Sequence, residues 1–418
     1  MTDVARTNWA RNVVFSAPAL HRPTTVADLQ VLVAHSDKLR VLGTGHSFSD
    51  IADTTGDLVS IGGLPPRIDI DTAARSVTVS GGTRYGELGK ALQAAGWALA
   101  NTGSLPHISV AGASSTGTHG SGNAIGNLST IVSALEMIQA DGELVHHSRA
   151  IDGDDFDGMV LALGCLGVVT ALTLDVVPTF DLQQDVYDDL PHEDLLTHFD
   201  EVSASGYSVS AFSTWRRPQT HQIWRKYVVA TGSVAAAPAT MFGAALAGEY
   251  RSPLGPGWPT DNITAQGTPG PWNERLPHFR LDFTPSSGAE LQSEFMIDRS
   301  LAAPALRALA DIADRIAEVL QVTELRTVAA DDLWLSPSYR RNSVCLHFTW
   351  VDRVADVLPV VRAVEERLDL FEFRPHWGKV FTCPPAAVRG RYERMADFRD
   401  VADRHDPVSY THLSLPTN

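Results

Sequence analysis

The stretch VLGTGHSFSD, residues 41–50, ends a run of strand-like residues in a glycine turn that carries a histidine. Gly43 and Gly45 permit a tight turn and leave successive backbone N–H groups with little side-chain obstruction. Such a turn suits a pyrophosphate, although a plain turn at the end of a strand would use the same glycines. Neither interpretation needs His46, so this histidine requires a chemical explanation of its own.

A second glycine-rich segment, NTGSLPHISVAGASSTGTHGSG, occupies residues 101–122. Serine and threonine hydroxyls are interleaved with its glycines, and it is neither charged nor apolar enough for an ordinary surface or core. Small residues let a large flat ligand approach the backbone, and hydroxyls offer uncharged hydrogen bonds. A flexible surface loop is the alternative. Together with the turn at 41–50, the segment favours a dinucleotide held across two turns of one α/β domain.

Short helices and strands are predicted around both turns. Residues 22–36 predict a helix with Thr25 as its N-cap, and residues 76–96 predict a strand, a turn and a helix. Residues 130–148 predict two strands around an Asp-Gly turn, and residues 163–178 predict a glycine turn followed by a long strand. The first half of the chain therefore alternates strands and helices.

The second half of the chain has a different pattern. Residues 230–275 are rich in glycine, proline and alanine, and irregular segments of that length are usually functional or mobile. Residues 279–297 predict a strand followed by a hairpin or turn. Two helices and two strands are predicted to follow, which indicates an antiparallel sheet with helices on one face.

Two of those strands carry polar side chains on one face. Glu324 and Arg326 are two residues apart in QVTELRTV and therefore share a face. In VCLHFTW, apolar residues alternate with Cys345, His347 and Thr349. A polar face backed by an apolar one is typical of a pocket wall. A solvated face with a weak surface ion pair is the alternative.

Other motifs either exclude a function or leave it open. The sequence contains no P-loop and no convincing G-x-G-x-x-G motif after a strand. In HEDLLTH, the two histidines are six residues apart and fall on different helical faces, so no metal site is predicted. Lys379, in RPHWGKVF, lies among aromatic residues and is either a pocket lysine or a snorkelling surface residue.

Composition limits the partners and the compartment. The chain has 418 residues, which favours two domains, and its net charge of -16 argues against nucleic acid as a partner and favours a small substrate. Three widely spaced cysteines and the absence of a signal peptide predict a cytoplasmic protein. No membrane-spanning segment is predicted, and a monomer is expected.

The motifs GTGHSFSD, NTGSLPHISVAGASSTGTHGSG, LGCLGVVT, ELRTVAAD, HFTW and HWGKVF, in this order, resemble those of the alditol (xylitol) oxidases. These are vanillyl-alcohol-oxidase-like flavoproteins and relatives of the aldonolactone oxidases. The resemblance implies an α+β fold, with two α/β FAD-binding subdomains of the PCMH type and an α+β cap domain that contains an antiparallel sheet. It implies an FAD-binding domain over 1–178, a cap over 179–373 and a return to the FAD-binding domain over 374–407.

The resemblance also assigns roles residue by residue. His46 matches the histidine that bonds covalently to the 8α-methyl group of FAD. The other positions that match FAD contacts are Val41, Leu42, Gly43, Thr44, Gly45, Ser47, Ser104, Ser109, Gly112, Ala113, Ser114, Ser115, Val168, Val169 and His376. The positions that match the polyol-binding set are Ser104, Glu324, Arg326, Thr349 and Lys379. His347 matches a catalytic-site histidine, and no metal is implied.

The chemistry of alcohol oxidation fits this set. With water's pKa of ~15.7 as a guide, an alkoxide costs roughly 12 kcal/mol to form at pH 7. Arg326 and Lys379 can offset that cost with positive charge, and either Lys379 or His347 can take the proton. If Gly103 lies over the flavin, its missing side chain leaves room for O2. We therefore expect an oxidase that converts a linear polyol such as xylitol or sorbitol to the aldose and yields hydrogen peroxide.

Two alternatives remain open at this point. An aldonolactone oxidase or dehydrogenase, acting on a gulono-, galactono- or arabinono-1,4-lactone, shares the histidine turn, the Glu-x-Arg pair and HWGK. An FAD-binding protein without turnover is the other. After RHDP the family pattern stops abruptly, and residues 408–418, VSYTHLSLPTN, are interpreted as a non-native tail that a sequencing adapter could encode. Loss of the natural C-terminal segment would weaken flavin binding or folding.

Overall fold

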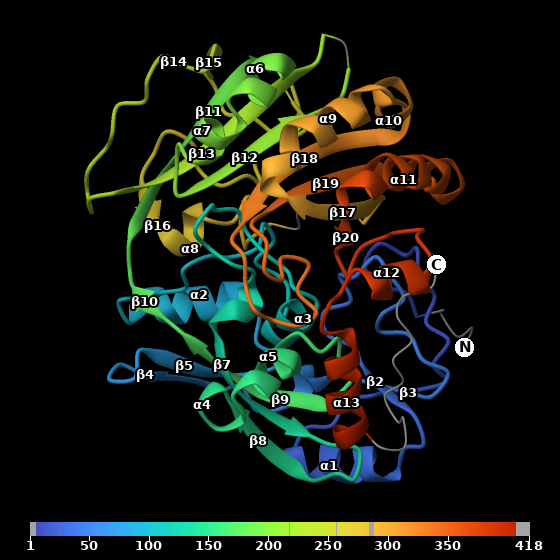
Figure 1. Cartoon of the computed structure of the whole chain (residues 1–418). Helices are drawn as coiled ribbons and strands as arrows, with labels where there is room; N and C mark the ends of the chain where they lie inside the picture. The colour runs from blue at the N-terminus through green and yellow to red at the C-terminus, as the bar shows by residue number, and fades with distance from the viewer. Residues whose placement is uncertain (1–5, 217, 256, 284–287, 407–418) are drawn as a thin grey trace, which may run out of the picture.

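A computed structural model describes residues 6–216, 218–255, 257–283 and 288–406, so the tail at 408–418 lies outside the described residues. The chain has two halves, one above the other in Figure 1: the lower half contains a three-stranded and a five-stranded sheet, and the upper half contains a ten-stranded sheet. Among the described residues, no helix combines the length and apolar character that a membrane span requires.

The lower half contains the N-terminal turns. A three-stranded parallel sheet has the order β1-β3-β2, and a five-stranded antiparallel sheet has the order β4-β5-β9-β7-β8. The strands are β1 (Leu20–His21), β2 (Leu39–Val41), β3 (Asp57–Val59), β4 (Ile68–Asp71), β5 (Ser76–Ser80), β6 (Trp97–Ala98), β7 (Val132–Ile138), β8 (Leu144–Ser148) and β9 (Val168–Asp175). The helices are α1 (Val26–His35), α2 (Tyr85–Ala94), α3 (Val110–Ser115), α4 (Arg149–Asp152) and α5 (Asp154–Val160).

Local sequence signals correctly predicted helix α1 and the hairpin of β7 and β8. Helix α1 begins after Thr25, whose side chain accepts a hydrogen bond from the backbone N–H of Asp28 at 3.0 Å, as an N-cap should. The predicted hairpin is the pair β7 and β8, and Gly142 in its turn has φ +84°. A positive φ is accessible to glycine at no steric cost, which is why the Asp-Gly signal was reliable.

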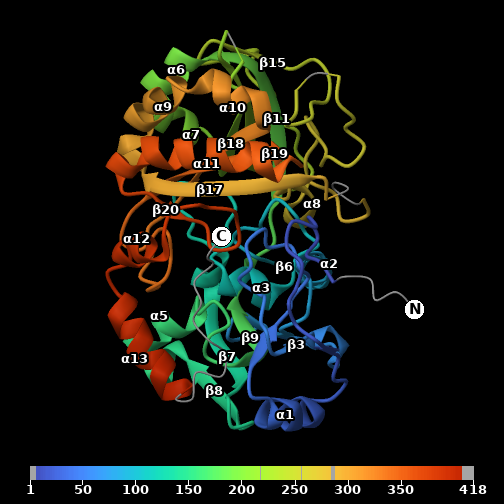
Figure 2. The ribbon, with the colours of Figure 1, turned by 90° about the vertical axis from the view of Figure 1, so that its right-hand side faces the viewer.

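The upper half is a ten-stranded sheet with the order β14-β15-β11-β13-β12-β18-β19-β17-β20, with β16 paired to β11. Its strands are β11 (Asp181–Pro191), β12 (Ser208–Ser213), β13 (Thr220–Val229), β14 (Thr240–Met241), β15 (Ala244–Leu246), β16 (Gly270–Pro271), β17 (Glu290–Asp298), β18 (Leu320–Val328), β19 (Ser343–Val351) and β20 (Arg374–Pro375). The helices α6 (His192–Thr197), α7 (Phe199–Ser203), α9 (Ala302–Ala310), α10 (Ala313–Val319) and α11 (Val354–Leu368) cover the face that points away from the lower half (Figure 2).

The prediction for residues 279–297, a strand followed by a hairpin or turn, was wrong because the turn comes first and the strand second. The strand is β17, at the end of that range, and residues 280–283 form a turn. Aromatic and apolar residues at 279–283 resembled a strand, but Phe279 makes an isolated bridge with Ile263, and the carbonyl oxygen of Leu281 lies 2.9 Å from Nε2 of His107 in the lower half. Because the strand was predicted too early in the chain, the alternation of side chains along β17 was not recognised.

Strand β19 explains why the large sheet has one apolar and one polar face. Val344, Leu346, Phe348 and Trp350 are fully buried in the main hydrophobic core, and side chains of α11 such as Val361 lie in the same core. Burying each large side chain contributes about 1.5–3 kcal/mol. The residues between them, His347 and Thr349 included, therefore face the lower half.

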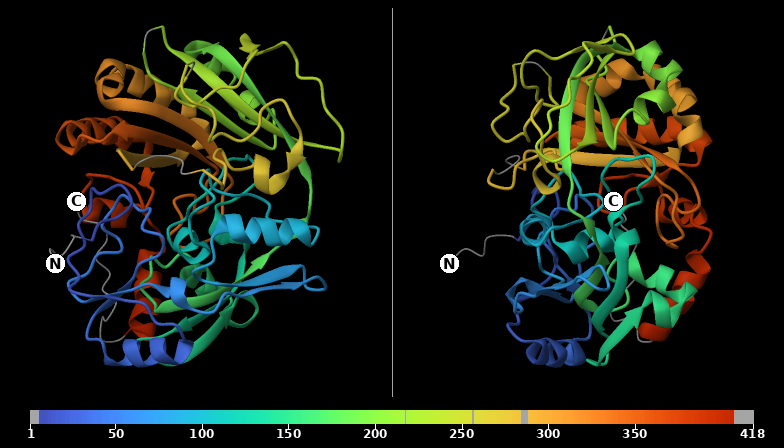
Figure 3. Two further views of the ribbon diagram at one scale, coloured as in Figure 1. Left: turned by 180° about the vertical axis from the view of Figure 1, so that it is seen from behind. Right: turned by 90° about the vertical axis from the view of Figure 1, so that its left-hand side faces the viewer.

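The C-terminal segment returns to the lower half. After β20, the chain forms α12 (Pro385–Gly390) and α13 (Met395–His405), and α13 packs against α5. Both views in Figure 3 place this red C-terminal helix beside the lower sheet. Earlier in the chain, the passage from the lower half to the upper sheet lies between β10 (Val177–Pro178) and β11.

Candidate active site

A cavity of about 1240 Å³ lies between the two halves. Segments 41–49 and 103–119 line it from the lower half, and the polar face of the large sheet lines it from above. The residues predicted for the site that line it are Val41, Leu42, Gly43, Thr44, Gly45, His46, Ser47, Ser104, Ser109, Gly112, Ala113, Ser115, Val169, Glu324, Arg326, His347, Thr349, His376 and Lys379. The fold therefore brings together residues that are more than 300 positions apart in the sequence.

Two predicted residues do not line the cavity. Ser114 is buried within α3, and its carbonyl oxygen accepts a hydrogen bond from Oγ of Ser129 at 2.6 Å. Val168 begins β9 and packs with Leu29 and Val33 in a separate hydrophobic cluster. Their predicted contacts with a cofactor stay predictions.

The glycine turn forms a shallow cradle at the lower wall. Gly45 has φ +71°, and its carbonyl oxygen accepts a hydrogen bond from the N–H of Trp9 at 2.8 Å. A Cβ atom on Gly43 or on Gly112 would lie 2.9 Å from Oγ of Ser109. A side chain at either position would require Oγ of Ser109 to move, whereas glycine leaves the backbone of the cradle accessible to a ligand.

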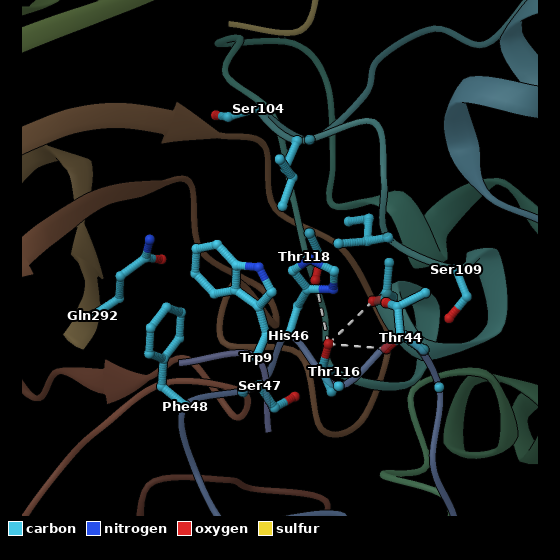
Figure 4. Close-up of a pocket in the computed structure, with 18 of the residues that line it drawn as sticks. Trp9, Thr44, His46, Ser47, Phe48, Ser104, Ser109, Thr116, Thr118 and Gln292 are labelled. Carbon is cyan, nitrogen blue, oxygen red and sulfur yellow. Dashed lines mark hydrogen bonds between the residues drawn. The ribbon is translucent and has the colours of Figure 1, made fainter. Parts of the chain in front are cut away.

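His46 projects from this turn into the cavity, where its ring stacks on Trp9 (Figure 4). The two ring centroids are 5.4 Å apart, with an angle of 26° between the planes. Burial, followed by the positive charges of His107 and Arg84, lowers the pKa of His46 to about 4. Nδ1 of His46 is buried and has no hydrogen-bond partner among the described residues. A neutral imidazole with an orphaned nitrogen fits the histidine to which a flavin is attached, because a bond to the cofactor would engage that atom.

The polar side chains above the cavity come from three neighbouring strands in register. Glu294 on β17 lies opposite His347 on β19, and His347 lies opposite Glu324 on β18. Arg326, two residues after Glu324, lines the cavity as well, which confirms that these two side chains share a face. The sheet register therefore sets the spacing of this row.

Glu294 is the residue at the centre of the row, and the sequence did not reveal it. Its carboxylate lies 2.7 Å from Nη2 of Arg326, 2.9 Å from Nζ of Lys379 and 3.2 Å from Nε2 of His119. Burial alone would raise the pKa of Glu294, but the charges of Lys379 and Arg326 hold it well below the usual range. Glu294 lies within the largely apolar run LQSEFMI, and a charged residue in such a run is a signal for a side chain that faces a pocket. The prediction placed the strand too early in the chain and therefore missed this signal.

Lys379 and His347 form the part of the row that can move a proton. Nζ of Lys379 lies 2.5 Å from Nδ1 of His347, and Nε2 of His347 lies 3.2 Å from Oγ1 of Thr349. Burial, followed by the charge of Lys379, lowers the pKa of His347 to about 4. Burial also lowers the pKa of Lys379, against the opposing charge of Glu294. The site thus contains a neutral imidazole next to an amine that is easier to deprotonate than an ordinary lysine.

Arg326 connects the row to the glycine-rich segment below. Its Nη1 lies 3.4 Å from Oγ of Ser104 and 3.3 Å from the carbonyl oxygen of His119. The charges of Glu324 and Glu294 overcome the effect of burial and raise the pKa of Arg326, so its guanidinium stays charged. Ser104 and Arg326 therefore face one space from opposite walls.

One group of potential metal ligands, His119, Glu294 and Cys345, lies at the back of this row within the part of the chain that the structure describes. Both carboxylate oxygens of Glu294 already face a cation, Arg326 or Lys379. A divalent ion would have to displace these charges, so the donor set does not suit a metal.

Comparisons with known proteins show that the chain is an FAD-dependent oxidoreductase. Residues 17–148 match the FAD binding domain family, and residues 289–410 match the D-arabinono-1,4-lactone oxidase family. The fold resembles that of cholesterol oxidase from B. sterolicum, with a TM-score of 0.76 and 14% identity over 98% of this chain and 95% of that one.

Similarity to whole proteins narrows the class. The chain is 50% identical to an alditol oxidase of Streptomyces sp., over 97% of this chain and 96% of that protein. It is 29% identical to an L-gulono-1,4-lactone dehydrogenase of Mycobacterium tuberculosis, over 96% of this chain and 95% of that protein. The chain belongs to the alditol oxidase family of FAD-dependent oxidoreductases, as its motifs predicted.

Proposed function

We propose that the protein oxidises a terminal primary alcohol of a linear polyol, such as xylitol or sorbitol, to the aldose and reduces O2 to hydrogen peroxide. The observation that carries the proposal is the buried polar row above the cavity. It offers Arg326 as a cation, Lys379 as an amine, Glu324 as an acceptor and Thr349 as a hydroxyl. Several polar partners suit a chain of hydroxyl groups, because an apolar alcohol would leave them unpaired.

The cradle at residues 41–47 and the segment around Ser104 and Ser109 would hold the FAD, with His46 as its covalent attachment. When bound, FAD accepts the hydride that the alcohol carbon loses. Gly43 and Gly112 support this placement because a side chain there would collide with Ser109.

Side chains of the protein assist the removal of the proton from the substrate hydroxyl. Forming an alkoxide costs roughly 12 kcal/mol at pH 7, and charged Arg326 beside the substrate lowers that cost. Lys379, in its neutral form, accepts the hydroxyl proton. His347 is the weaker candidate for the base, because Nδ1 faces Lys379 and Nε2 faces Thr349. Glu294 then stabilises the ammonium that forms on Lys379 at 2.9 Å.

A lactone is the second candidate substrate. The match of residues 289–410 to the D-arabinono-1,4-lactone oxidase family supports it. A flat lactone ring needs fewer hydroxyl partners than a linear polyol, so the row from Ser104 to Lys379 favours the polyol.

The predicted division of the chain belongs to the same proposal. Residues 1–178 and 374–407 form the FAD-binding domain and residues 179–373 form the cap. The passage to the upper sheet after β10 and the return after β20 support these boundaries. Among the described residues, no disulfide joins Cys165, Cys345 or Cys383, which supports a cytoplasmic location.

Visible spectroscopy of the purified holoprotein tests the attachment to FAD. After acid precipitation, yellow colour should stay with the protein pellet and should move to the supernatant in His46→Ala. Colour that moves to the supernatant in the unaltered protein would remove the role proposed for His46. An oxygen electrode and a peroxide assay with xylitol test the use of O2.

A further inference from the structure

Behind Glu324 lies a buried hydrogen-bonded chain that the site described so far does not use. It runs from Lys226 on β13, through His278 in the loop that follows α8 (Trp272–Arg275), to Glu324 on β18. Lys226 is 1% exposed and His278 is 5% exposed. We infer that Lys226 and His278 are positioning residues that fix the Glu324 carboxylate for the hydroxyls of the substrate. The inference rests on the proposed polyol oxidation.

Lys226 anchors the chain because all its partners are acceptors. Its Nζ lies 2.5 Å from the carbonyl oxygen of Leu276, 3.3 Å from that of Pro277 and 3.0 Å from Nδ1 of His278. Burial lowers the pKa of Lys226 to about 7, and in its ammonium form the group has three donors and no acceptor, so it satisfies all three contacts at once. Lys226 therefore holds both the backbone and the side chain of this loop.

The contacts of His278 select one tautomer. Because Nδ1 accepts from Lys226, the ring proton of the neutral imidazole is on Nε2, and Nε2 lies 2.8 Å from Oε1 of Glu324. Phe212 and Trp224 hold the ring edge-on, at centroid distances of 5.7 and 5.2 Å. Burial, followed by the charge of Lys226, lowers the pKa of His278 to about 4, which agrees with a neutral ring.

The same loop contacts the lower wall of the cavity. The backbone N–H groups of His278 and Phe279 both donate to the carbonyl oxygen of Ser104, at 3.1 and 3.2 Å. One short loop thus sets the position of Glu324 above the cavity and of Ser104 below it. Oε2 of Glu324 has no hydrogen bond among the described residues, and Glu324 lines the cavity. With Oε1 fixed by His278, Oε2 is the oxygen available to a substrate hydroxyl.

This arrangement makes the two residues determinants of polyol affinity. Without His278, the Glu324 carboxylate can turn toward Arg326, whose Nε is 3.7 Å from Oε1, and away from the substrate. Hydrogen bonds to a charged group typically contribute a factor of roughly 10 to 100 in an equilibrium constant. The expected loss in His278→Leu is of that size and falls mainly on KM.

Kinetics of holoenzyme variants test the inference. Anaerobic flavin reduction by xylitol is measured for His278→Leu, Lys226→Met and Glu324→Gln, and for the double variants. We expect kcat/KM to fall about 10- to 100-fold in His278→Leu. His278→Gln should recover much of the loss, since its amide can donate to Glu324. In the Glu324→Gln background, His278→Leu should add less than a factor of about 3, because it acts through Glu324.

A matched control is His221→Leu. His221 is another fully buried histidine, on the same strand as Lys226, and its partner is His192 at 3.0 Å. It can lower the Tm, but it should leave KM for xylitol unchanged. An unchanged kcat/KM in His278→Leu, or effects of the two substitutions that multiply in the double variant, would overturn the inference.

A measurement without substrate separates this inference from the proposed function. In protein labelled with 15N-histidine, signals assigned through His278→Gln should show a proton on Nε2 and none on Nδ1 at pH 7. The Nδ1-protonated tautomer or an imidazolium would overturn the chain of hydrogen bonds. If the unaltered enzyme does not react with polyols but the Nε2–H tautomer is found, the proposed function fails and the chain from Lys226 to Glu324 stands.

Discussion

Glu294→Gln keeps the shape of the central acidic side chain and removes its charge. In the unaltered protein, one carboxylate oxygen lies 2.7 Å from Nη2 of Arg326 and the other lies 2.9 Å from Nζ of Lys379. The glutamine amide retains one acceptor and places an N–H group opposite a cation. Both cations then lose the negative charge of a carboxylate that is 1% exposed.

The size of the effect follows from this burial. Breaking a buried ion pair by removing one partner costs about 3–5 kcal/mol. With an unfolding entropy of about 2.1 cal/mol/K per residue, a chain of 418 residues should lose roughly 3–6 °C in Tm. Differential scanning calorimetry of the holoprotein measures this change directly.

The same substitution should shift the pH dependence of catalysis. Neutral Lys379 is the proposed base, so kcat/KM rises as the pH passes through the pKa of Lys379. The charge of Glu294 raises that pKa against the lowering effect of burial. In Glu294→Gln the pKa of Lys379 therefore falls further, and the rising limb of the profile moves to lower pH.

Glu365→Gln is the control for losing a buried carboxylate. Glu365 is 5% exposed, but within the described part of the chain its hydrogen-bond partners are the N–H and hydroxyl of Thr382, with no cation among them. Burial raises the pKa of Glu365. Neutralising this side chain should therefore change the Tm by no more than about 1–2 °C, and it should leave the pH profile of kcat/KM unchanged. The reasoning is refuted if Glu294→Gln leaves the Tm unchanged, or if the rising limb stays in place or moves to higher pH.

Three further substitutions test other parts of the account. Lys379→Met should lower kcat/KM for xylitol about 10²–10⁴-fold and abolish the rising limb of the pH profile, and a limb that persists would assign the base elsewhere. Gly45→Ala forces alanine to φ +71° and should lower the free energy of unfolding, measured by thermal melting, by about 1–2 kcal/mol. Gly248→Ala is the control and should be tolerated, because no atom of the described residues lies within 4 Å of the new Cβ. In Gly103→Ala the new Cβ lies 3.5 Å from Cγ2 of Thr118, which is an ordinary contact. Stopped-flow spectroscopy should therefore show that xylitol reduces the flavin at an unchanged rate and that O2 reoxidises it more slowly. Equally fast reoxidation would contradict the role of Gly103.

Features with a local cause could be predicted from the sequence. Thr25 caps α1 through a hydrogen bond three residues away, and Gly142 closes a hairpin between adjacent strands. The period of two along β18 placed Glu324 and Arg326 on one face without any knowledge of their neighbours. The family resemblance then supplied the cofactor and the fold, which the comparisons with known proteins confirm.

Features that depend on pairing between distant segments could not be predicted. Glu294 faces Arg326 and Lys379 because β17, β18 and β19 pair in one register, and no local pattern encodes that register. Lys226 and His278 are 52 positions apart and meet through an irregular loop. Single polar residues inside apolar runs were the available signal for these side chains, and such residues are ambiguous until the fold supplies their partners.

The most direct test of the central claim is the flavin absorbance of the purified holoprotein, followed by stopped-flow spectroscopy without oxygen. The account predicts that xylitol or sorbitol bleaches the oxidised flavin rapidly, and that L-gulono-1,4-lactone does so far more slowly. Bleaching by the lactone with no response to either polyol would contradict polyol oxidation and assign the protein to lactone oxidation. No bleaching by any of the three would contradict the catalytic role of the row from Glu294 to Lys379.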